Sequence, residues 1–455
     1  MKIIPAIVLF SFLPSLFSCR KFVAVDPPTN QVTSETVFTS EATARATVNG
    51  IYIQMMNDPN QFTSGLTTFY AGLAADELAP YSPGNLEEFR LNKISLANHA
   101  ALQSGFWQPA YKYIYTANLI LEGLAGATTV PAAAREGLMG EARFVRAFCY
   151  FYLVNLFGDV PLVTRSNYLD NANLARAPKE IVYQQILDDL KEAQQGLPAD
   201  HPAGEKSKPN KWAATALLAR TYLYLKDWNN AKEAAGAVLN SGQFSLSPLK
   251  TSFTKNSSEA IWQLQPVNPD LNTYEAWTLL PSSPTSLPTY TITPELLTAF
   301  EAGDERKAAW DSAHFYNGST VHIPSKYKEN RYNAPLTEYY TVLRLAEVLL
   351  IHAEAAAHLS HTSDALASLN LVRARAGLAD LPALAGAPLF QAIEQERRIE
   401  LFAEWGHRWL DLKRTGRVDA VLGPIKPTWS PLAALWPVPQ NEINLNPALT
   451  QNPGY

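Results

Sequence analysis

Two short segments of the sequence bring aromatic side chains close to hydrogen-bonding side chains. The first segment contains Asp76, Tyr81, Asn85 and Arg90, and the second contains Asn272, Tyr274 and Trp277. A sugar ring has an apolar face and hydroxyl groups at its edge, so a protein binds it with a flat aromatic side chain flanked by donors and acceptors. We expect these residues to contribute to an oligosaccharide-binding site. Core packing is the alternative for each aromatic residue, because such side chains also supply much of the buried area of a fold.

Compact catalytic and cofactor motifs do not occur in the sequence. It has no Gly-x-Ser-x-Gly, no His-Glu-x-x-His, no phosphate-binding loop and no dinucleotide fingerprint. The acid pairs Asp76-Glu77 and Glu87-Glu88 leave glycoside hydrolysis open, because catalytic separation is a distance in space that sequence spacing does not give. We expect a protein that is not an enzyme and that binds no cofactor.

Three histidines near the end of a predicted helix could suggest a metal site. They are His352, His358 and His361, and the last two stand about one helical turn apart. No cysteine or further ligand accompanies them at zinc-type spacing, and a polar turn follows directly. We therefore interpret them as surface residues and expect no metal.

Charged residues recur at helical spacing near the C-terminus, at Glu396, Glu400, Glu404, Arg408 and Asp411. They could be read as paired catalytic carboxylates. However, Ile399, Phe402, Gly406 and Trp409 form an apolar stripe at three- and four-residue steps, which indicates one helix packed on the rest of the fold. We interpret the charges as structural and expect most of them to pair with neighbours one turn away.

Two segments share the spacing of a tetratricopeptide helical hairpin. In residues 212–239, Ala219 and Tyr222 are followed by Ala231, and in residues 340–373 Ala353 precedes Ala365 by the same twelve positions. Apolar residues at three- and four-residue steps predict further helices over 106–124, 138–157 and 181–195. Four stacked hairpins would form a superhelix, so the predicted fold class is mainly α. Four tryptophans fit these helical stripes and are expected in the core: Trp107, Trp228, Trp405 and Trp409.

Residues 241–339 interrupt the repeat pattern. Prolines are spread through this region, so long helices cannot persist in it. It also contains many tryptophans and tyrosines, which a disordered linker would lack. We predict an ordered, loop-rich excursion beside two helical parts, 41–240 and 340–455. Tyr274 and Trp277 lie in it between Pro269 and Pro281, where no repeat requires an aromatic residue.

The N-terminus has the layout of a bacterial lipoprotein signal. Lys2 precedes an uncharged apolar run that ends directly before Cys19. The run is shorter than the ~20 residues of a membrane-spanning helix, and Pro5 and Pro14 interrupt it. We expect cleavage after residue 18, lipidation of Cys19 and a tether over residues 19–40. A plain signal peptide or a transmembrane helix is the alternative.

Composition limits the possible partners. The chain has 37 Lys and Arg against 42 Asp and Glu, with a formal net charge of −5, which argues against nucleic acid or an anionic membrane surface as a partner. Hydrophobic residues make up 47% of the chain and charged residues only 17%, so a large core is expected. Cys19 and Cys149 are the only cysteines, and a lipidated Cys19 would leave Cys149 without a partner in the chain.

Sequence patterns along most of the chain match one known family. They comprise the run 22–30 behind Cys19, the residues Trp107, Tyr111 and Asn118, the stretch 140–147 with the following 157–161, the segment 396–414 and the ending 436–455. The last two are specific signals. On these residues the chain resembles the SusD/RagB family of Bacteroidetes outer-membrane lipoproteins.

The resemblance implies tetratricopeptide-like helix pairs with a ligand-binding excursion, and a surface-exposed place at the outer membrane. It also implies a non-enzymatic partner of a TonB-dependent transporter barrel. Such proteins sit over the barrel as a hinged lid that captures oligosaccharides or, in some members, peptides. From the residues themselves, an exported glycosidase and a protein–protein scaffold stay open as alternatives.

The first prediction concerns the lipid anchor. Replacing Cys19 by Ala should move the protein from the membrane fraction to the soluble fraction, because the composition of the remaining chain suggests no surface that binds a membrane. Fractionation followed by immunoblotting measures this. Retention of the variant in the membrane fraction of cells that lack the transporter would contradict lipid anchoring.

Overall fold

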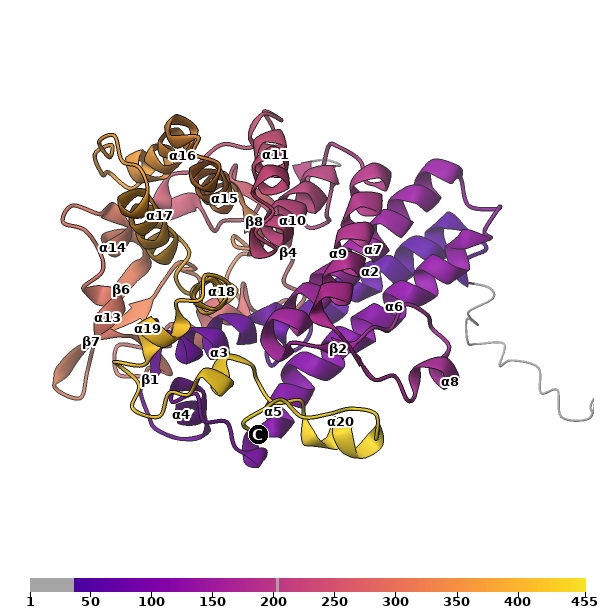
Figure 1. Ribbon diagram of the computed structural model, residues 1–455, viewed down its shortest axis with the longest axis horizontal. Helices are drawn as coiled ribbons and strands as arrows, with labels where there is room; N and C mark the ends of the chain where they lie inside the picture. Colours follow the sequence, from indigo (N-terminus) through magenta and orange to yellow (C-terminus); the bar gives the residue numbers. More distant parts are fainter. Residues whose placement is uncertain (1–36, 202–203) are drawn as a thin grey trace, which may run out of the picture.

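Helices dominate the structure and follow one another as a row of packed neighbours (Figure 1). The computed structural model describes residues 37–201 and 204–455. Cys19 lies outside the described residues, so lipidation stays a prediction. Within the described part of the chain, no helix is long and apolar enough to cross a membrane.

Along the sequence, most of the helices come before or after a strand-rich middle region. They are α2 (Glu41–Met56), α3 (Leu66–Ala74), α4 (Asn85–Arg90), α5 (His99–Leu102), α6 (Gln108–Ala125), α7 (Ala132–Phe157), α8 (Tyr168–Asn171), α9 (Lys179–Gly196), α10 (Lys211–Tyr224), α11 (Trp228–Leu239), α12 (Tyr274–Leu279), α13 (Pro294–Leu297), α14 (Glu305–Trp310), α15 (Leu345–His358), α16 (Thr362–Arg375), α17 (Ala387–Glu400), α18 (His407–Arg414), α19 (Val418–Leu422) and α20 (Gln440–Leu445).

The strands of the described residues are short and form four two-stranded antiparallel sheets. They are β1 (Leu78–Pro80) with β5 (Tyr290–Ile292), β2 (Val160–Pro161) with β3 (Arg176–Ala177), β4 (Ala260–Leu264) with β8 (Tyr340–Arg344), and β6 (Asp311–Tyr316) with β7 (Ser319–Pro324). Two of these sheets, β1–β5 and β4–β8, join the excursion to the helical parts before and after it.

The helical row confirms the predicted mainly-α fold of stacked hairpins. Helix α7 packs between α6 and α9, α10 follows α9, and α11 continues through α15 to α16. In Figure 1 this row runs from α6 on the right to α16 and α17 at the upper left, with β6, β7 and α14 at the left end. The helices predicted over 106–124, 138–157 and 181–195 correspond to α6, α7 and α9.

Helix α7 is the centre of the first helical part because it is apolar around almost its whole circumference from Leu138 onward. Its one deeply buried cation, Arg146, donates to Asp189 on α9 at 2.8 and 2.5 Å and to the side-chain oxygen of Asn118 on α6 at 2.6 Å. One guanidinium group therefore ties three helices together. Cys149 is fully buried on the same helix, and burial raises the pKa of its thiol well above the usual value.

Hairpin α10–α11 has the predicted close contacts. Ala219 and Ala231 are fully buried, and the side chain of Asp227 caps α11 by accepting from the backbone N–H of Asn230. In the second hairpin, Ala353 and Ala365 are likewise fully buried. That segment differs from expectation at its start, because residues 340–344 form β8 and pair with β4 before α15 begins.

The C-terminal charged segment is not one continuous helix, which corrects the sequence-based expectation. Helix α17 ends at Glu400 and α18 begins at His407, and between them Ala403, Trp405 and Gly406 have φ values of 50°, 47° and 71°. A Cβ at position 406 would lie 2.6 Å from the Cβ of Ala71, so only glycine allows this turn to approach α3 so closely. Trp405 is turned into the core as a result, and it is 1% exposed.

The excursion is ordered, as predicted, and contributes to the main core. Trp262 and Trp310 are fully buried, and the indole N–H of Trp310 donates to the carbonyl oxygen of Leu249 at 3.0 Å. Of the four tryptophans expected in the core, Trp107, Trp405 and Trp409 are buried there, whereas Trp228 is half-buried and stacks on His358.

The close approach at Ala231 yields the second prediction. Replacing Ala231 by Trp should lower the free energy of unfolding by about 1 to 3 kcal/mol, because α11 packs against both α10 and α15 and leaves no space for an indole. Thermal and chemical unfolding measure this. Ala237→Trp, at an exposed position of the same helix, is the matched control and should leave stability nearly unchanged. Equal stability of the two variants would refute the tight packing at Ala231.

Candidate ligand-binding site

A network of buried charges connects the excursion with the helical parts. The carboxylate of Glu400 accepts from Arg306 at 3.0 Å and from Arg344 at 2.5 Å, and it also pairs with Arg375. Burial opposes the charge, but the guanidinium groups of Arg375, Arg344 and Arg306 together hold the pKa of Glu400 well below its usual value. This carboxylate is therefore ionised inside the core.

Glu404 extends the same network. It accepts from the Nε and Nη2 atoms of Arg344 at 2.7 Å each, and it pairs with Lys326 of the excursion. The expectation that these charges pair mainly with neighbours one turn away is wrong for Glu396, Glu400 and Glu404. Their partners come from β8, α14, α16 and the segment after β7.

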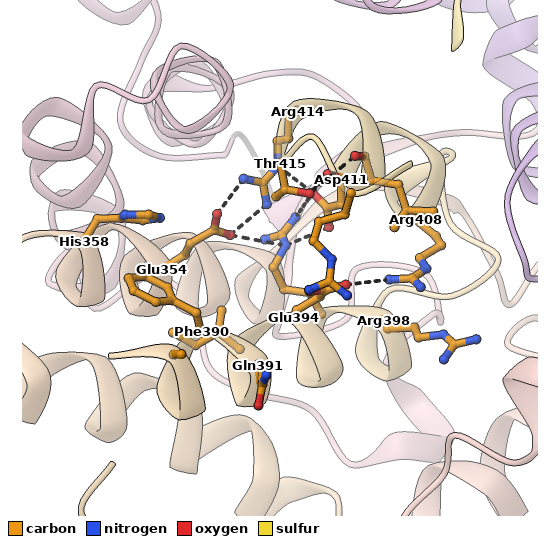
Figure 2. A pocket seen from close by; sticks show the side chains of 15 residues that line it. Glu354, His358, Phe390, Gln391, Glu394, Arg398, Arg408, Asp411, Arg414 and Thr415 are labelled. Carbon is orange, nitrogen blue, oxygen red and sulfur yellow. Dashed lines mark hydrogen bonds and ion pairs between the residues drawn. The ribbon is translucent and has the colours of Figure 1, made fainter. Parts of the chain in front are cut away.

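A charged cleft lies between α15, α17 and α18 (Figure 2), with a volume of about 320 Å³. The charges that line it are already paired: Glu354 accepts from Arg414 at 2.6 and 2.7 Å, and Asp411 accepts from Arg397 at 2.8 Å. Phe390 supplies an apolar wall. We interpret the cleft as a seam between helices whose ion pairs hold them together.

The three histidines considered as metal ligands reach separate partners. His352 hydrogen-bonds Ser368 at 2.8 Å, and His361 lies 2.9 Å from the ammonium of Lys232. His358 is exposed, and its ring stacks on Trp228 at a centroid distance of 3.8 Å. The described residues contain no group of three or more histidine, cysteine or acidic side chains that could hold a metal ion.

Asp76 and Asn272, both expected to contact a ligand, are buried in the structure. Asp76 is 4% exposed and accepts from Arg408 and Arg398 at 2.7 Å each. Burial raises the pKa of Asp76, but the hydrogen bond and charge of Arg408, the charge of Arg398 and a backbone hydrogen bond together outweigh it, so the net pKa is lowered. Asn272 accepts from the backbone N–H groups of residues 337 and 338 at 2.8 and 2.9 Å. Both side chains hold loops in place.

Three further predicted residues do not form a joint platform. Asn85 is exposed at the start of α4, and Arg90 at its end donates from Nε to Glu87 at 2.8 Å. Tyr274 begins α12 and is only 9% exposed, so it contributes mainly to packing.

Tyr81 and Trp277, the remaining predicted residues, are not among the lining residues of an open cavity of about 910 Å³, but each is connected to that lining. Tyr81 follows β1 and meets Tyr316 edge to face at a centroid distance of 5.5 Å. Trp277 is 45% exposed on α12, which leads into residues 280 and 281 of the cavity wall. We call this space the aromatic cavity. Its lining residues are Leu280, Pro281, Ser282, Ser283, Pro284, Thr285, Ser312, Ala313, His314, Phe315, Tyr316, Asn317 and Asn330.

The β6–β7 hairpin positions the aromatic side chains of the cavity. Its turn is Asn317-Gly318, and both residues have positive φ, as a tight two-residue hairpin turn requires. His314 and Tyr316 are two positions apart on β6 and therefore share one face. Their rings lie side by side at 6.2 Å, with planes only 15° apart. Phe315, on the other face of the strand, is 67% exposed.

The opposite wall is held by one amide. The side-chain N–H₂ group of Asn330 donates to the carbonyl oxygens of Leu280 and Pro281 at 3.0 and 3.1 Å. Tyr332, two residues further on, is 61% exposed and donates to Asp270 at 2.5 Å. His314, Phe315, Tyr316 and Asn330 were not predicted as site residues, although Asn317-Gly318 beside three rings is a recognisable hairpin signal.

Two protein-family models match most of the chain. Residues 21–223 match a family model described as "Starch-binding associating with outer membrane", and residues 290–429 match the model of the SusD family. The chain belongs to the SusD/RagB family. Two SusD-like proteins of Formosa agariphila are each 27% identical to it; one alignment covers 100% of both chains, the other 94% of this chain and 95% of the relative.

Solved SusD structures have the same fold. A SusD superfamily protein from Bacteroides vulgatus aligns with a TM-score of 0.80 at 21% identity, covering 92% of this chain and 100% of the other. A protein described as a laminarin-binding SusD-like protein aligns with a TM-score of 0.76 at 24% identity, again over 92% and 100%. The family predicted from the sequence patterns is therefore confirmed.

A buried carboxyl group on α12, the helix that carries Trp277, yields the third prediction. Burial raises the pKa of Glu275 to about 8, although hydrogen bonds from Tyr340 and Thr68 lower it. An unfolded glutamate has a pKa of about 4.3. Below that pH the carboxyl group is neutral in both states and the free energy of unfolding is at its full value. Between that pH and about 8 the unfolded state loses the proton more readily than the folded state, so the free energy of unfolding falls. Glu275→Gln should flatten this decline and make the variant the more stable protein above pH 8, by on the order of a few kcal/mol.

Melting curves between pH 5 and 9 measure the effect. The exposed Glu180→Gln is the matched control and should keep the profile of the unmodified protein. Parallel profiles for Glu275→Gln and the unmodified protein would assign the decline to another group, such as Glu77, whose pKa burial and the charge of Asp76 also raise to about 8.

Proposed function

We propose that this protein captures an oligosaccharide at the aromatic cavity and passes it to a transporter of the outer membrane. The observation that carries the proposal is the pair of side-by-side rings of His314 and Tyr316, which form one wall of a cavity of about 910 Å³. This volume lies near the upper end of the range usual for small-molecule sites.

The arrangement suits a sugar for a physical reason. The edge contact with Tyr81 fixes the plane of the Tyr316 ring before any ligand arrives, so little conformational entropy is lost on stacking. Hydroxyl groups of the 282–285 turn and the amide groups of Asn317 and Asn330 lie beside the rings. They are suitable partners for the hydroxyl groups at the edge of a sugar.

The relatives support the same class of ligand. One matching family model is described as starch-binding, and a neighbour of the same fold is described as laminarin-binding. We extend glycan binding, without turnover, to this chain on those grounds together with the aromatic cavity.

The proposed lipid anchor and transporter partner rest on the family and on the N-terminal sequence. We propose that Cys19 carries the lipid that holds the protein at the outer membrane, surface-exposed, and that a TonB-dependent transporter barrel is its partner. In this arrangement the protein acts as a lid subunit that closes over the barrel with its ligand. Co-purification of the transporter with the lipidated protein tests the partnership directly.

The fourth prediction tests the ligand platform. Tyr316→Ala and Trp277→Ala should each weaken glycan binding by on the order of 2 kcal/mol, roughly thirty-fold, because each removes a ring that stacks on the ligand. Isothermal calorimetry against malto-, laminari-, cello-, manno- and galacto-oligosaccharides measures this. Melting temperatures should change little, since Trp277 is 45% exposed and Tyr316 lies on a hairpin face.

The matched control is Tyr168→Ala on α8, an exposed tyrosine at the opposite end of the molecule (Figure 1). It should bind with unchanged affinity. Chromatography of the glycan after the titration should show it intact. Tight binding of a peptide with no binding of any glycan would replace oligosaccharide capture by peptide capture, and unchanged affinity of both variants would place the site elsewhere.

A further inference from the structure

We infer that the ligand of the aromatic cavity is an uncharged oligosaccharide, without carboxylate or sulfate groups. This inference rests on the proposed function and narrows it to one chemical class. It depends on which side chains line the cavity and on how the charges around it are already used.

The lining is built from rings, hydroxyl groups and amides. Among the described residues that form it there is no Lys, Arg, Asp or Glu, and the imidazole of His314 has its Nε2 atom 2.9 Å from the carbonyl oxygen of Ser286. The charged cleft, in contrast, is lined by several arginines and carboxylates. Hydroxyl and amide groups exchange hydrogen bonds with sugar hydroxyls at little net cost. A carboxylate or sulfate brought against the same wall would lose hydration without gaining a cation.

The charged side chains beside the wall do not supply that cation. Arg331 follows Asn330, but its guanidinium donates from Nε and Nη2 to Glu329 at 2.9 and 2.6 Å. Asp311 precedes Ser312 of the lining. Its carboxylate pairs with His322, whose Nδ1 lies 2.6 Å away. Arg331 and His322 therefore each already have a carboxylate partner.

The acidic groups near the cavity offer an anion no partner either. Asp270 accepts the Tyr332 hydroxyl at 2.5 Å, and Glu329 and Asp311 lie next to lining residues in the chain. A carboxylate does not bind an anion, so none of these groups offsets the hydration that an anionic ligand would lose. A neutral ligand has no such cost.

A matched pair of ligands tests the inference. The neutral hexose oligosaccharide of the panel that binds best is compared with the same oligosaccharide after oxidation of its C6 hydroxyl groups to carboxylates. We expect the oxidised ligand to bind at least tenfold more weakly. The affinity for the neutral ligand should also stay constant between about 0.05 and 0.5 M salt, because screening acts only on charge.

A substitution at the cavity rim gives an independent readout. Ser282→Lys places a cation on an exposed residue of the lining and should restore binding of the oxidised ligand, whereas Ser282→Gln, the control of similar length, should not. Equal or tighter binding of the oxidised ligand by the unmodified protein would overturn the inference and leave oligosaccharide capture intact. Binding of no ligand from either set would instead overturn the proposed function, and the inference with it.

Discussion

The fold depends on one buried carboxylate, that of Glu400, which meets guanidinium groups from three different parts of the chain. Arg306 belongs to the excursion, Arg344 ends β8 and Arg375 ends α16. A charge in the core is stable only when its partners are held in place, so these three elements cannot move apart without leaving an unpaired ion. The excursion is thereby fixed to the helical row in a way that its few short strands could not achieve alone.

The C-terminal segment that contains Glu400 is also connected to the aromatic cavity. Arg398 on α17 and Arg408 on α18 both hold Asp76, which stands two residues before β1, and β1 ends directly before Tyr81. Tyr81 in turn meets Tyr316 across the cavity wall. A continuous path of contacts therefore runs from the ionic core to the aromatic surface.

Much of the fold could be predicted because helical periodicity is a local property. Helices α6, α7, α9, α10 and α11 follow from apolar spacing within each segment. The break after Glu400 could not be predicted, since its apolar stripe continues unbroken and the cause is the close approach of Gly406 to Ala71. At the candidate site, ligand binding by Tyr81 and Trp277 stays a prediction. Asp76 and Asn272, also predicted to bind the ligand, are buried, because an irregular segment gives no periodicity that separates buried from exposed polar residues. The rings of β6 were not predicted as site residues, because the turn signal at Asn317-Gly318 indicates a hairpin but not which of its side chains line a cavity.

The tight turn at Asn317-Gly318 has a consequence for how such a binding surface can change over time. The hairpin is anchored in the core at its base, where Trp310 precedes β6 and Ile323 lies in β7, both fully buried. Its tip carries the exposed Phe315, and there β6 pairs only with β7. Mutations at the tip are thus free of the constraints that hold the base, and insertions there would lengthen two strands without refolding the core. Relatives sharing this scaffold could diverge in ligand preference through the hairpin alone, while the ionic core keeps all of its contacts.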